Sequence, residues 1–564
     1  MIYTDSFNRL SVIFIYYSGG LKFIMRLFKI NNLSHEFAGK SLFNKAEITV
    51  QSGEHIGLVG PNGCGKSTFL KILTGEFIPD SFKIEKSNNL KIGYLDQYAD
   101  IDKTCTVYEY LNSVFDELYD LDRQVNKIYE NISELSETEQ MKAVNKAQKI
   151  SDYLDVKEFY QIYKKIESVL NGLGFTENDR IKTVNQLSGG MKTKLILAKI
   201  LLTDNDILVL DEPTNFLDMS YIAWLEDYLC RLKYAFIVIS HDKSFLNKIS
   251  DKIIEIANKV FKIYNGNYDF YIKEKKRLEA VQLQQHIAQN KYIQKSEEYV
   301  EAHYYNNTGG DGKTKAVWLK KMLETLQKIE KPDEIIKPKF AFKFLRGASK
   351  QILSVDNIEV GYNNSPVLPP VSFSVQRGEK IVFKGFNGIG KTTLLKSIYG
   401  DLPIILGNIN FGENIEIVFL KQEEDYENNF SHFDKNQRKS LGIKKGRQKE
   451  ITVIEFAKEY YPEKPQKELQ AAMFSCGLNE MHFFNQVRTL SGGEMTKLRL
   501  CLAMMNPVNL IILDEPTNHL DIYSKEVLMH SLEEFEGTVL MTTHDINADI
   551  SWATNIINLE DLFN

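Results

Sequence analysis

The sequence predicts an α/β fold in which two copies of one domain stand in tandem, with a helical arm inserted in the first copy and an α-helical hairpin linking the two. Three observations predict this architecture. The stretch from Leu187 to Asp218 recurs almost letter for letter from Leu490 to Asp521, which indicates an internal duplication. Within that stretch a helical segment precedes an apolar strand, Ile207 to Leu210. A polar, helix-favouring segment of about 80 residues separates the copies.

Length and composition set limits on the class of protein. The 564 residues suffice for about three or four domains, and 43% hydrophobic with 26% charged residues is ordinary for a globular chain. A net charge of −6 argues against bulk electrostatic binding to nucleic acid, although a local basic surface stays open. The five cysteines form no C-x-x-C pair, so we expect a cytoplasmic protein without disulfides, zinc or an iron–sulfur cluster.

Residues 1–24 form an N-terminal extension. The apolar run at 11–28 is interrupted by Gly19, Gly20 and Lys22, and a membrane-spanning helix needs about 20 continuous apolar residues. No other segment is long enough, so we expect no membrane insertion. The extension either packs on the surface or reflects a start assigned too early. We favour Met25 as the true start, because a plausible strand opens there.

Matched residues in the two copies set the domain boundaries. Phe37, Lys66 and Gln97 lie 325 residues before Tyr362, Lys391 and Gln422, whereas Ser188, Asp211 and His241 lie 303 residues before Ser491, Asp514 and His544. The first copy therefore carries 22 more residues between its glutamine and its LSGG sequence. We place the first domain at 25–262, the linker at 263–350 and the second domain at 351–564.

The additional residues of the first copy predict a helical arm at about 105–160. Apolar residues from Val107 to Ile128 recur at heptad spacing, and Ser136 with Glu139 forms a capping box that starts a return helix. We expect an antiparallel hairpin that projects from the domain; the alternative is that these helices pack into the usual helical subdomain. The matching region of the second copy, 423–450, is polar and predicts a loop.

The linker predicts two long helices. The first runs from Tyr271 to about Ala302, a glycine-rich turn follows at 303–312, and the second begins near Lys313 and stops before Pro332. A connection with no other role would be shorter. We interpret the pair as a projecting lever; the alternative is a helical pair that lies on the domain surfaces.

Each copy contains the pattern G-x-x-x-x-G-K-[ST] between a predicted strand and a predicted helix. In this context backbone amides surround phosphates, the lysine meets the β- and γ-phosphate oxygens, and the hydroxyl of the last residue binds Mg²⁺. The motif residues are Gly60, Pro61, Asn62, Gly63, Cys64, Gly65, Lys66, Ser67 and Thr68 in the first copy, and Gly385, Phe386, Asn387, Gly388, Ile389, Gly390, Lys391, Thr392 and Thr393 in the second. We therefore expect two nucleotide sites.

A serine-glycine-glycine turn opens the helix of the repeated stretch, and two adjacent acids end its strand. The glycines allow a close approach of a phosphate to the helix N-terminus. Of the two acids, one can hold Mg²⁺ while its neighbour polarises a water. The residues are Ser188, Gly189, Gly190, Asp211 and Glu212 in the first copy and Ser491, Gly492, Gly493, Asp514 and Glu515 in the second.

This ordered set of motifs resembles the ATP-binding cassette (ABC) superfamily over nearly the whole chain outside the linker and the first residues. The resemblance implies an ATPase that uses ATP and Mg²⁺. It also implies a role for each residue: Phe37 and Tyr362 stack on adenine, Gln97 and Gln422 sense Mg²⁺ and the attacking water, Asp211 and Asp514 hold the metal with Ser67 and Thr392, Glu212 and Glu515 act as general bases, and His241 and His544 contact the γ-phosphate.

ABC domains pair head to tail, so the resemblance implies intramolecular pairing of two cassettes in a monomer. Residues 491–494 would close the Lys66 site and residues 188–191 the Lys391 site, with the γ-phosphate holding the halves together until hydrolysis. Two departures from the usual pattern occur: Met191 follows the first LSGG, and Phe216 stands where the second copy has His519. Neither removes a catalytic group, so we expect two competent sites, and unequal turnover at the two is a hypothesis.

The arm and the linker resemble those of the ABC-F family, and Tyr264 to Tyr271 (YNGNYDFY) leads into the linker much as in that family. Other twin-cassette classes need long coiled coils or an iron–sulfur domain, which this sequence lacks. The resemblance implies a translation factor that binds the tRNA exit site of the ribosome in the ATP state. The linker tip would point at large-subunit rRNA, the P-site tRNA and the peptidyl-transferase centre.

Three functions stay open. The glycine-rich linker tip and the polar insert at 423–450, together with the absence of a basic C-terminal tail, favour protection of the ribosome from antibiotics. The second possibility is a housekeeping ABC-F translation factor. The third, of another class, is the cytosolic ATPase subunit of a separate membrane transporter, although such subunits usually lack an 80-residue charged linker.

Overall fold

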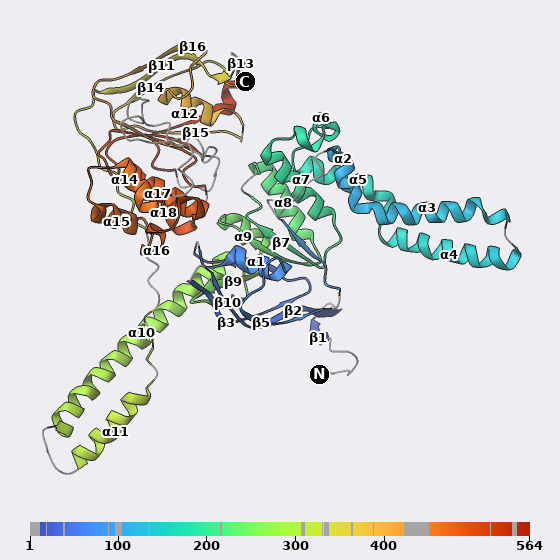
Figure 1. Cartoon of the computed structure of the whole chain (residues 1–564), viewed down its shortest axis with the longest axis horizontal. Coiled ribbons are helices and arrows are strands. Elements are labelled where there is room, and N and C mark those ends of the chain that lie inside the picture. The colour runs from blue at the N-terminus through green and yellow to red at the C-terminus, as the bar shows by residue number, and fades with distance from the viewer. Residues whose placement is uncertain are drawn as a thin grey trace.

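The computed structural model contains two α/β cassettes, a helical arm and a helical hairpin (Figure 1). It describes residues 12–17, 20–37, 40–61, 63–87, 89–95, 104–134, 136–214, 217–305, 311–326, 328–329, 331, 338–362, 365–386, 388–421, 451–518, 520–543 and 550–563. We use cassette 1 for residues 12–264 and cassette 2 for residues 338–563. Tandem cassettes with a helical insert confirm the predicted fold class.

Cassette 1 contains a six-stranded sheet, in the order β10-β9-β4-β8-β7-β6, that is parallel except for the β10–β9 pair. An antiparallel sheet of β1, β2, β3 and β5 faces it. The strands are β1 (Val12–Tyr17), β2 (Gly20–Phe37), β3 (Lys40–Gln51), β4 (His55–Val59), β5 (Ser81–Lys86), β6 (Ile92–Tyr94), β7 (Ile207–Asp211), β8 (Ala235–Ile239), β9 (Lys252–Ala257) and β10 (Val260–Tyr264).

Helix α1 (Lys66–Thr74) lies between the two sheets of cassette 1. Its Phe69 and Leu70 are fully buried against Ile56 and Leu58 of β4 on one side and Phe43 of β3 on the other. The near-continuous apolar runs in β4, β7 and β8 are typical of parallel strands covered on both faces. Because these strands are parallel neighbours, the loops after β4 and β7 emerge at one edge of the sheet.

Cassette 2 repeats this plan. Its parallel sheet has the order β17-β18-β19-β15-β20, and a three-stranded antiparallel sheet has the order β14-β11-β16. The strands are β11 (Gln351–Glu359), β12 (Gly361–Tyr362), β13 (Ser365–Pro366), β14 (Val371–Gln376), β15 (Lys380–Lys384), β16 (Leu406–Phe411), β17 (Ile417–Leu420), β18 (Leu510–Asp514), β19 (Thr538–Thr543) and β20 (Asn555–Asn558). Helix α12 (Lys391–Tyr399) follows β15 as α1 follows β4.

Helices cover the parallel sheets and form a helical half in each cassette. In cassette 1 they are α2 (Val107–Asn112), α5 (Ile162–Gly172), α6 (Glu177–Ile181), α7 (Gly189–Leu202), α8 (Met219–Arg231) and α9 (Lys243–Ile249). In cassette 2 they are α14 (Val453–Tyr460), α15 (Gln466–Ser475), α16 (Glu480–Phe483), α17 (Gly492–Ala503) and α18 (Ile522–Glu534).

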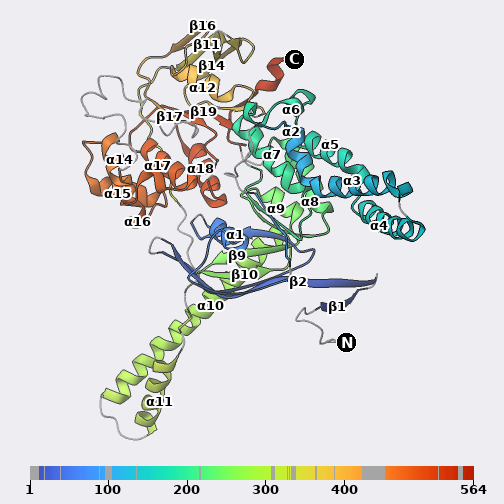
Figure 2. The same ribbon diagram turned by 45° about the vertical axis from the view of Figure 1, so that its right-hand side comes forward.

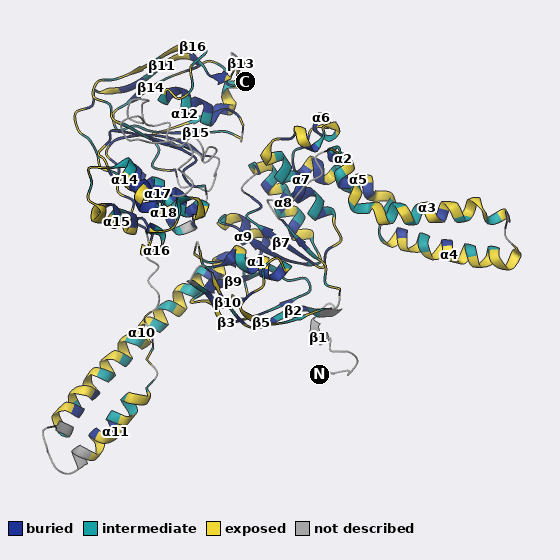
Figure 3. Ribbon diagram, viewed as in Figure 1, coloured by how far each residue is buried: buried dark blue, intermediate teal, exposed yellow. Residues whose placement is uncertain are grey.

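The arm consists of α3 (Asp116–Glu130) and α4 (Glu137–Val156), which lie antiparallel and project from cassette 1 (Figures 1 and 2). Ser136 caps α4 and forms the predicted capping box with Glu139. The heptad run predicted as one helix is divided, because a tight turn at Ser113–Phe115 separates α2 from α3. Leu111 of α2 is fully buried in the cassette, whereas most of α3 and α4 is exposed (Figure 3).

The linker forms a second projection, the lever hairpin, made of α10 (Tyr268–Val300) and α11 (Asp311–Thr325) (Figure 2). The 33 residues of α10 span about 50 Å. Helix α10 begins three residues before the predicted Tyr271, because the Asn267 side chain accepts a hydrogen bond from the Phe270 amide. His286 and Gln289 of α10 hold the end of the returning segment through the backbone of Ile329, at 2.6 and 2.7 Å.

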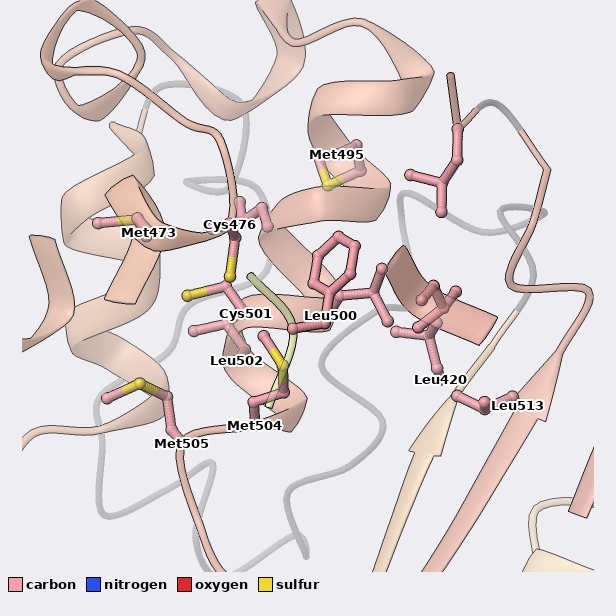
Figure 4. Close-up of a cluster of buried hydrophobic side chains, with 14 of the residues drawn as sticks. Leu420, Met473, Cys476, Met495, Leu500, Cys501, Leu502, Met504, Met505 and Leu513 are labelled. Carbon is pink, nitrogen blue, oxygen red and sulfur yellow. The ribbon is translucent and has the colours of Figure 1, made fainter. Parts of the chain in front are cut away.

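The helical half of cassette 2 has a sulfur-rich core (Figure 4). The sulfur-bearing side chains are Met473, Cys476, Met495, Cys501, Met504 and Met505. Cys476 and Cys501 are free, buried thiols that interact directly, although the sequence shows no paired spacing. Their hydrogen bond, together with burial, raises the pKa of Cys501. These thiols pack as apolar groups.

The first long strand begins earlier than the sequence predicts. The strand that was predicted to open at Met25 begins at Gly20, because β1 pairs antiparallel with its first residues and extends the ladder. The predicted loop at 423–450 lies outside the described residues. Among the residues that the structure describes, no helix is long and apolar enough to cross a membrane.

Candidate active site

The loop between β4 and α1 forms the first phosphate-binding motif. Gly65 caps α1 with a φ of 101°, a conformation that favours glycine, and a Cβ atom at this residue would lie 3.0 Å from the ring of Phe43. The Lys66 ammonium lies within its own loop, where it donates to the carbonyl oxygens of Gly60 at 2.9 Å and Pro61 at 3.1 Å. These contacts hold the lysine at the place where phosphate oxygens would replace the carbonyls.

The loop between β15 and α12 has the same geometry in cassette 2. Gly390 caps the helix with a φ of 116°, and Lys391 donates to Gly385 at 2.7 Å and Phe386 at 3.2 Å. Lys391 also forms an ion pair with Glu515 at 3.3 Å, and both side chains are almost fully buried. Tyr362 is half exposed and its hydroxyl accepts a hydrogen bond from Thr393 at 3.4 Å, so this aromatic ring lies beside the motif.

The two acids of cassette 1 lie directly beside the phosphate-binding motif. Asp211 accepts a hydrogen bond from Ser67, and burial raises the pKa of Asp211. Glu212 follows the strand with a φ of 49°, a strained conformation for a non-glycine residue. Burial and the neighbouring Asp211 raise the pKa of Glu212 to about 8, against the opposing effects of Lys66 and Lys525.

Glu212 also meets the histidine that the sequence predicts. The His241 amide donates to Glu212 at 3.3 Å, and the His241 Nε2 atom lies 3.5 Å from the carboxylate. In cassette 2, Glu515 has an almost identical φ of 48°, and Asn518 donates to its carboxylate at 2.8 Å. The same strained backbone conformation therefore recurs at the matching residue of both cassettes, although the contacts of the two carboxylates differ.

The metal-ligating chemistry fits Mg²⁺ at both sites. Mg²⁺ prefers oxygen ligands, and each site joins an aspartate to the hydroxyl of its motif, Asp211 with Ser67 and Asp514 with Thr392. Thr542 donates to Asp514 at 2.7 Å, while the other carboxylate oxygen, Oδ2, is buried without a hydrogen-bond partner among the described residues. A buried, unsatisfied carboxylate oxygen is suited to a cation.

The LSGG turns begin α7 and α17. The Ser188 and Ser491 side chains cap these helices, each accepting from the amide three residues on at 3.3 Å. In cassette 2 the cap is reinforced: Glu494 accepts from the Ser491 amide at 2.9 Å and from His482 at 3.0 Å. Burial opposes ionisation of Glu494, but the hydrogen bonds from His482 and Ser491 lower its pKa to about 2. Met191 cannot form these contacts in cassette 1.

A cavity of about 1040 Å³ joins the Lys66 motif of cassette 1 to the LSGG turn of cassette 2. Its volume is at the upper end of the roughly 300–1,000 Å³ typical of small-molecule sites. The predicted residues that line it are Gly63, Gly65, Lys66, Ser67, Thr68, Asp211, Glu212, His241, Ser491 and Gly493. The structure therefore brings together the two halves of the predicted Lys66 site. The pairing of residues 188–191 with Lys391 stays a prediction.

Some predicted residues lie outside the described part of the chain: Asn62, Gln97, Phe216, Asn387, Gln422, His519 and His544. Phe37 is placed only as the last residue of β2. In the other direction, sequence reasoning missed His482 and Lys525, which line the cavity from cassette 2. A comparison of the two copies could have found them, because the matching residues of cassette 1, Asp179 and Ile222, are of a different chemical type.

Comparisons with known proteins agree with this geometry. The family model described as ABC transporter matches residues 43–215 and 368–518, and a second model with the same description matches residues 254–342. The uncharacterized ABC transporter ATP-binding protein YfmM of Bacillus subtilis is 36% identical over 95% of this chain and 99% of its own length. ABC transporter F family member 5 of Arabidopsis thaliana is 31% identical over 94% of this chain and 75% of its own length.

The chain belongs to the ABC-F family. Its two cassettes bind ATP and make it an ATPase. Among solved structures, the archaeal ribosome recycling factor in complex with a ribosomal stalk protein has a TM-score of 0.54, with 19% identity over 93% of this chain and 87% of that chain. A structure described as a model of ribosome-bound archaeal Pelota and ABCE1 has a TM-score of 0.53, with 19% identity over 91% of this chain and 74% of that chain. At this identity the likeness shows the fold alone.

Proposed function

We propose that this ABC-F ATPase binds the ribosome, occupies the tRNA exit site in the ATP state and directs its lever hairpin towards the P-site tRNA and the peptidyl-transferase centre. The observation that carries the proposal is the lever hairpin itself. Its longer helix, α10, spans about 50 Å, and its root contacts both cassettes, so a change in cassette pairing would move its tip.

The chemistry follows from the Lys66 site. The Lys66 ammonium and the amides of its loop hold the phosphates, Glu212 orients and deprotonates the attacking water, and His241 contacts the γ-phosphate beside it. Bound Mg²⁺, held by Ser67, Gln97 and Asp211, would neutralise phosphate charge; Thr392, Gln422 and Asp514 would do so at the second site. The backbone amides near Ser491 of cassette 2 contact the γ-phosphate from the opposite side, so the affinity for ATP depends on the pairing of the two cassettes.

The root of the lever hairpin is built around a buried carboxylate, which supports a mechanical role. Glu255 of β9 is 3% exposed and pairs in register with Val59, the residue that precedes the Lys66 motif. It accepts hydrogen bonds from the Tyr264 hydroxyl at 3.1 Å, the Tyr271 hydroxyl at 3.0 Å and the Lys275 ammonium at 2.5 Å. The first turns of α10 are therefore fixed to the strand that flanks the nucleotide.

The exposed surface of the lever hairpin presents groups that suit RNA. Exposed lysines are Lys273, Lys276, Lys291, Lys295, Lys315, Lys321 and Lys328, and Trp318 of α11 is 60% exposed. Such groups contact phosphates and stack on bases. Two cations of the same helix have acidic partners instead: Lys275 pairs with the buried Glu255, and Arg277 pairs with Glu274.

Sedimentation tests the ribosome proposal against the transporter alternative. The E212Q/E515Q double variant binds ATP without hydrolysing it in our account, so it should pellet with ribosomes in ATP and remain in the supernatant in ADP. The matched control is the same variant with Lys66→Ala and Lys391→Ala, which should not pellet in either nucleotide. Migration with membranes instead of ribosomes would favour an ATPase subunit of a separate transporter.

Protection of the ribosome from antibiotics is the specific role that we favour within this function. The glycine-rich linker tip at 303–312 and the insert at 423–450 support it over a housekeeping role. Expression should raise resistance to peptidyl-transferase inhibitors, and substitutions at 303–312 should change which drugs are resisted while ribosome binding persists. Unchanged drug sensitivity on expression would favour a housekeeping translation factor.

A further inference from the structure

The first turn of α18 in cassette 2 lies against cassette 1 and against the root of the lever hairpin. Glu526 forms an ion pair with Lys243 at the start of α9. Tyr523 forms a hydrogen bond with Lys275 at the root of the lever hairpin. Between these residues on the same turn, Lys525 lines the cavity that contains Glu212. This turn is therefore a contact between the cassettes rather than a part of cassette 2 alone.

Lys525 enters a cavity in which two carboxylates lie next to each other, Asp211 and Glu212. Burial raises the pKa of both carboxyl groups, and a nearby cation favours the ionised form of Glu212 that a general base needs. Within the described part of the chain, the lysines that line this cavity are Lys66 and Lys525. Lys66 donates to its own loop carbonyls, Gly60 and Pro61, and in the ATP state it is committed to phosphate oxygens. Lys525 carries the remaining positive charge that acts on Glu212.

The two glutamates differ in the lysines around them. Glu515 forms an ion pair at 3.3 Å with Lys391 of its own motif. Glu212 is acted on by Lys66 of its own motif and also by Lys525, a lysine of the opposite cassette that lines the same cavity. The residue that matches Lys525 in cassette 1, 303 residues earlier, is Ile222, which is buried and uncharged. The duplication therefore does not repeat the Lys525 charge at the matching position of cassette 1.

We propose that Lys525 is a positioning residue for the Lys66 site: its ammonium, delivered by cassette 2, orients the Glu212 carboxylate towards the attacking water when the cassettes close. The inference rests on the proposed role of Glu212 as general base. Because the lysine comes from the opposite cassette, the orientation of the base depends on closure, and hydrolysis before closure is suppressed. Misplacing a reacting group by about 1 Å can cost roughly a hundredfold in rate.

Single-turnover hydrolysis tests the proposal one site at a time. In an E515Q background, where phosphate release reports the Lys66 site, Lys525→Met should lower the rate constant roughly ten- to a hundredfold with the KM for ATP nearly unchanged. Lys525→Arg should restore most of the rate, because it returns the charge. In an E212Q background, Lys525→Met should leave hydrolysis at the Lys391 site unchanged. Equal losses in the two backgrounds would overturn the proposal.

Two further measurements separate positioning from other roles. Glu526→Gln breaks the neighbouring ion pair with Lys243 and keeps Lys525, so it should change the Lys66-site rate less than twofold; a loss as large as that of Lys525→Met would assign the effect to cassette docking. In E212Q/E515Q, Lys525→Met should not change the affinity for ATP. Weakened binding there would make Lys525 a phosphate ligand and overturn the positioning role. Full activity of E212Q at the Lys66 site would instead overturn the proposed role of Glu212 as general base, on which the inference rests.

Discussion

At the scale of single residues, the two glutamates that we propose as general bases have a strained backbone. Glu212 and Glu515 both adopt φ near +50°, which few non-glycine residues do, and both are nearly buried. Regular strand geometry would direct these side chains elsewhere. The surrounding contacts, such as the Glu212 amide bonded to Ile239 at 3.0 Å, hold the strained backbone in place.

The raised pKa of Glu212 gives a stability prediction. Its pKa is about 8 in the folded protein and near 4.5 when unfolded, so folding takes up a proton between these values. The stabilisation from that proton is complete below about pH 4.5 and is lost as pH rises towards 8. Glu212→Gln, which keeps an acceptor for the His241 amide, should stabilise nucleotide-free protein by on the order of 2–3 kcal/mol at pH 7.

Thermal unfolding without nucleotide or Mg²⁺ measures this effect. The Tm difference between E212Q and the unmodified protein should grow as pH is raised from 5 to 8. The exposed residue Glu297 provides the control, since Glu297→Gln should give a small difference that does not depend on pH. A Tm advantage of E212Q that is constant over this range would contradict the buried, protonated carboxylate.

Sequence alone predicted the phosphate-binding motifs that the structure places after β4 and β15, because such motifs depend on local backbone geometry. The strands His55–Val59 and Lys380–Lys384 and the helices after them follow from apolar runs and glycine placement. The family resemblance also implied that residues 491–494 close the Lys66 site from the second copy, but two other residues of cassette 2 were not predicted. Lys525 and His482 have no spacing relationship to the Lys66 motif, and only the pairing of the cassettes brings them to it.

At the scale of elements, the arm and the lever hairpin differ from their sequence predictions where each one joins the body of the protein. The predicted heptad run of the arm failed as a single helix, since its first residues pack into the cassette while the rest enters solvent. The lever hairpin was predicted to begin at Tyr271, whereas Tyr268 and Tyr271 are both buried in its root. Periodicity cannot reveal such roots, because the Tyr271 hydroxyl donates to Glu255, which belongs to strand β9 rather than to the hairpin.

The hydrogen bonds of Glu255 give a prediction for the lever root. Tyr271→Phe removes one donor to a buried carboxylate, so cassette 1 should lose about 1–2 kcal/mol of stability and its Tm should fall by a few degrees. Tyr292→Phe is the matched control, because that hydroxyl lies on the half-exposed hairpin surface, 3.8 Å from the Met322 sulfur. Equal Tm values for the two variants would show that Glu255 does not depend on its tyrosine donors.

Tyr271→Phe should also weaken the coupling between nucleotide and lever hairpin, if the root transmits closure. In the E212Q/E515Q background, its ATP-dependent pelleting with ribosomes should fall several-fold more than that of Tyr292→Phe. Comparable ATP affinity in the two variants, measured separately, would assign the loss to coupling. Undiminished pelleting of Tyr271→Phe would place the coupling elsewhere.

At the scale of the whole molecule, the duplication explains why neither cassette is sufficient. The stretch from Leu187 to Asp218 contributes Asp211 and Glu212 to the Lys66 site, and by the same head-to-tail logic its LSGG turn would serve the Lys391 site. The cavity between the Lys66 motif and Ser491 supports the first half of that arrangement. Cassette 2 also meets cassette 1 through Lys243–Glu526 and the lever root through Tyr523–Lys275, so closing the nucleotide site and moving the lever root are geometrically linked.

The most direct test of the central claim is a cryo-EM map of the E212Q/E515Q variant bound to ribosomes in ATP. We expect paired cassettes at the tRNA exit site, with density for ATP between Lys66 and Ser491. The lever hairpin should be directed at the P-site tRNA and the peptidyl-transferase centre. Binding at another ribosomal site, or a hairpin directed away from the P-site tRNA while ATP occupies the cassettes, would contradict that claim.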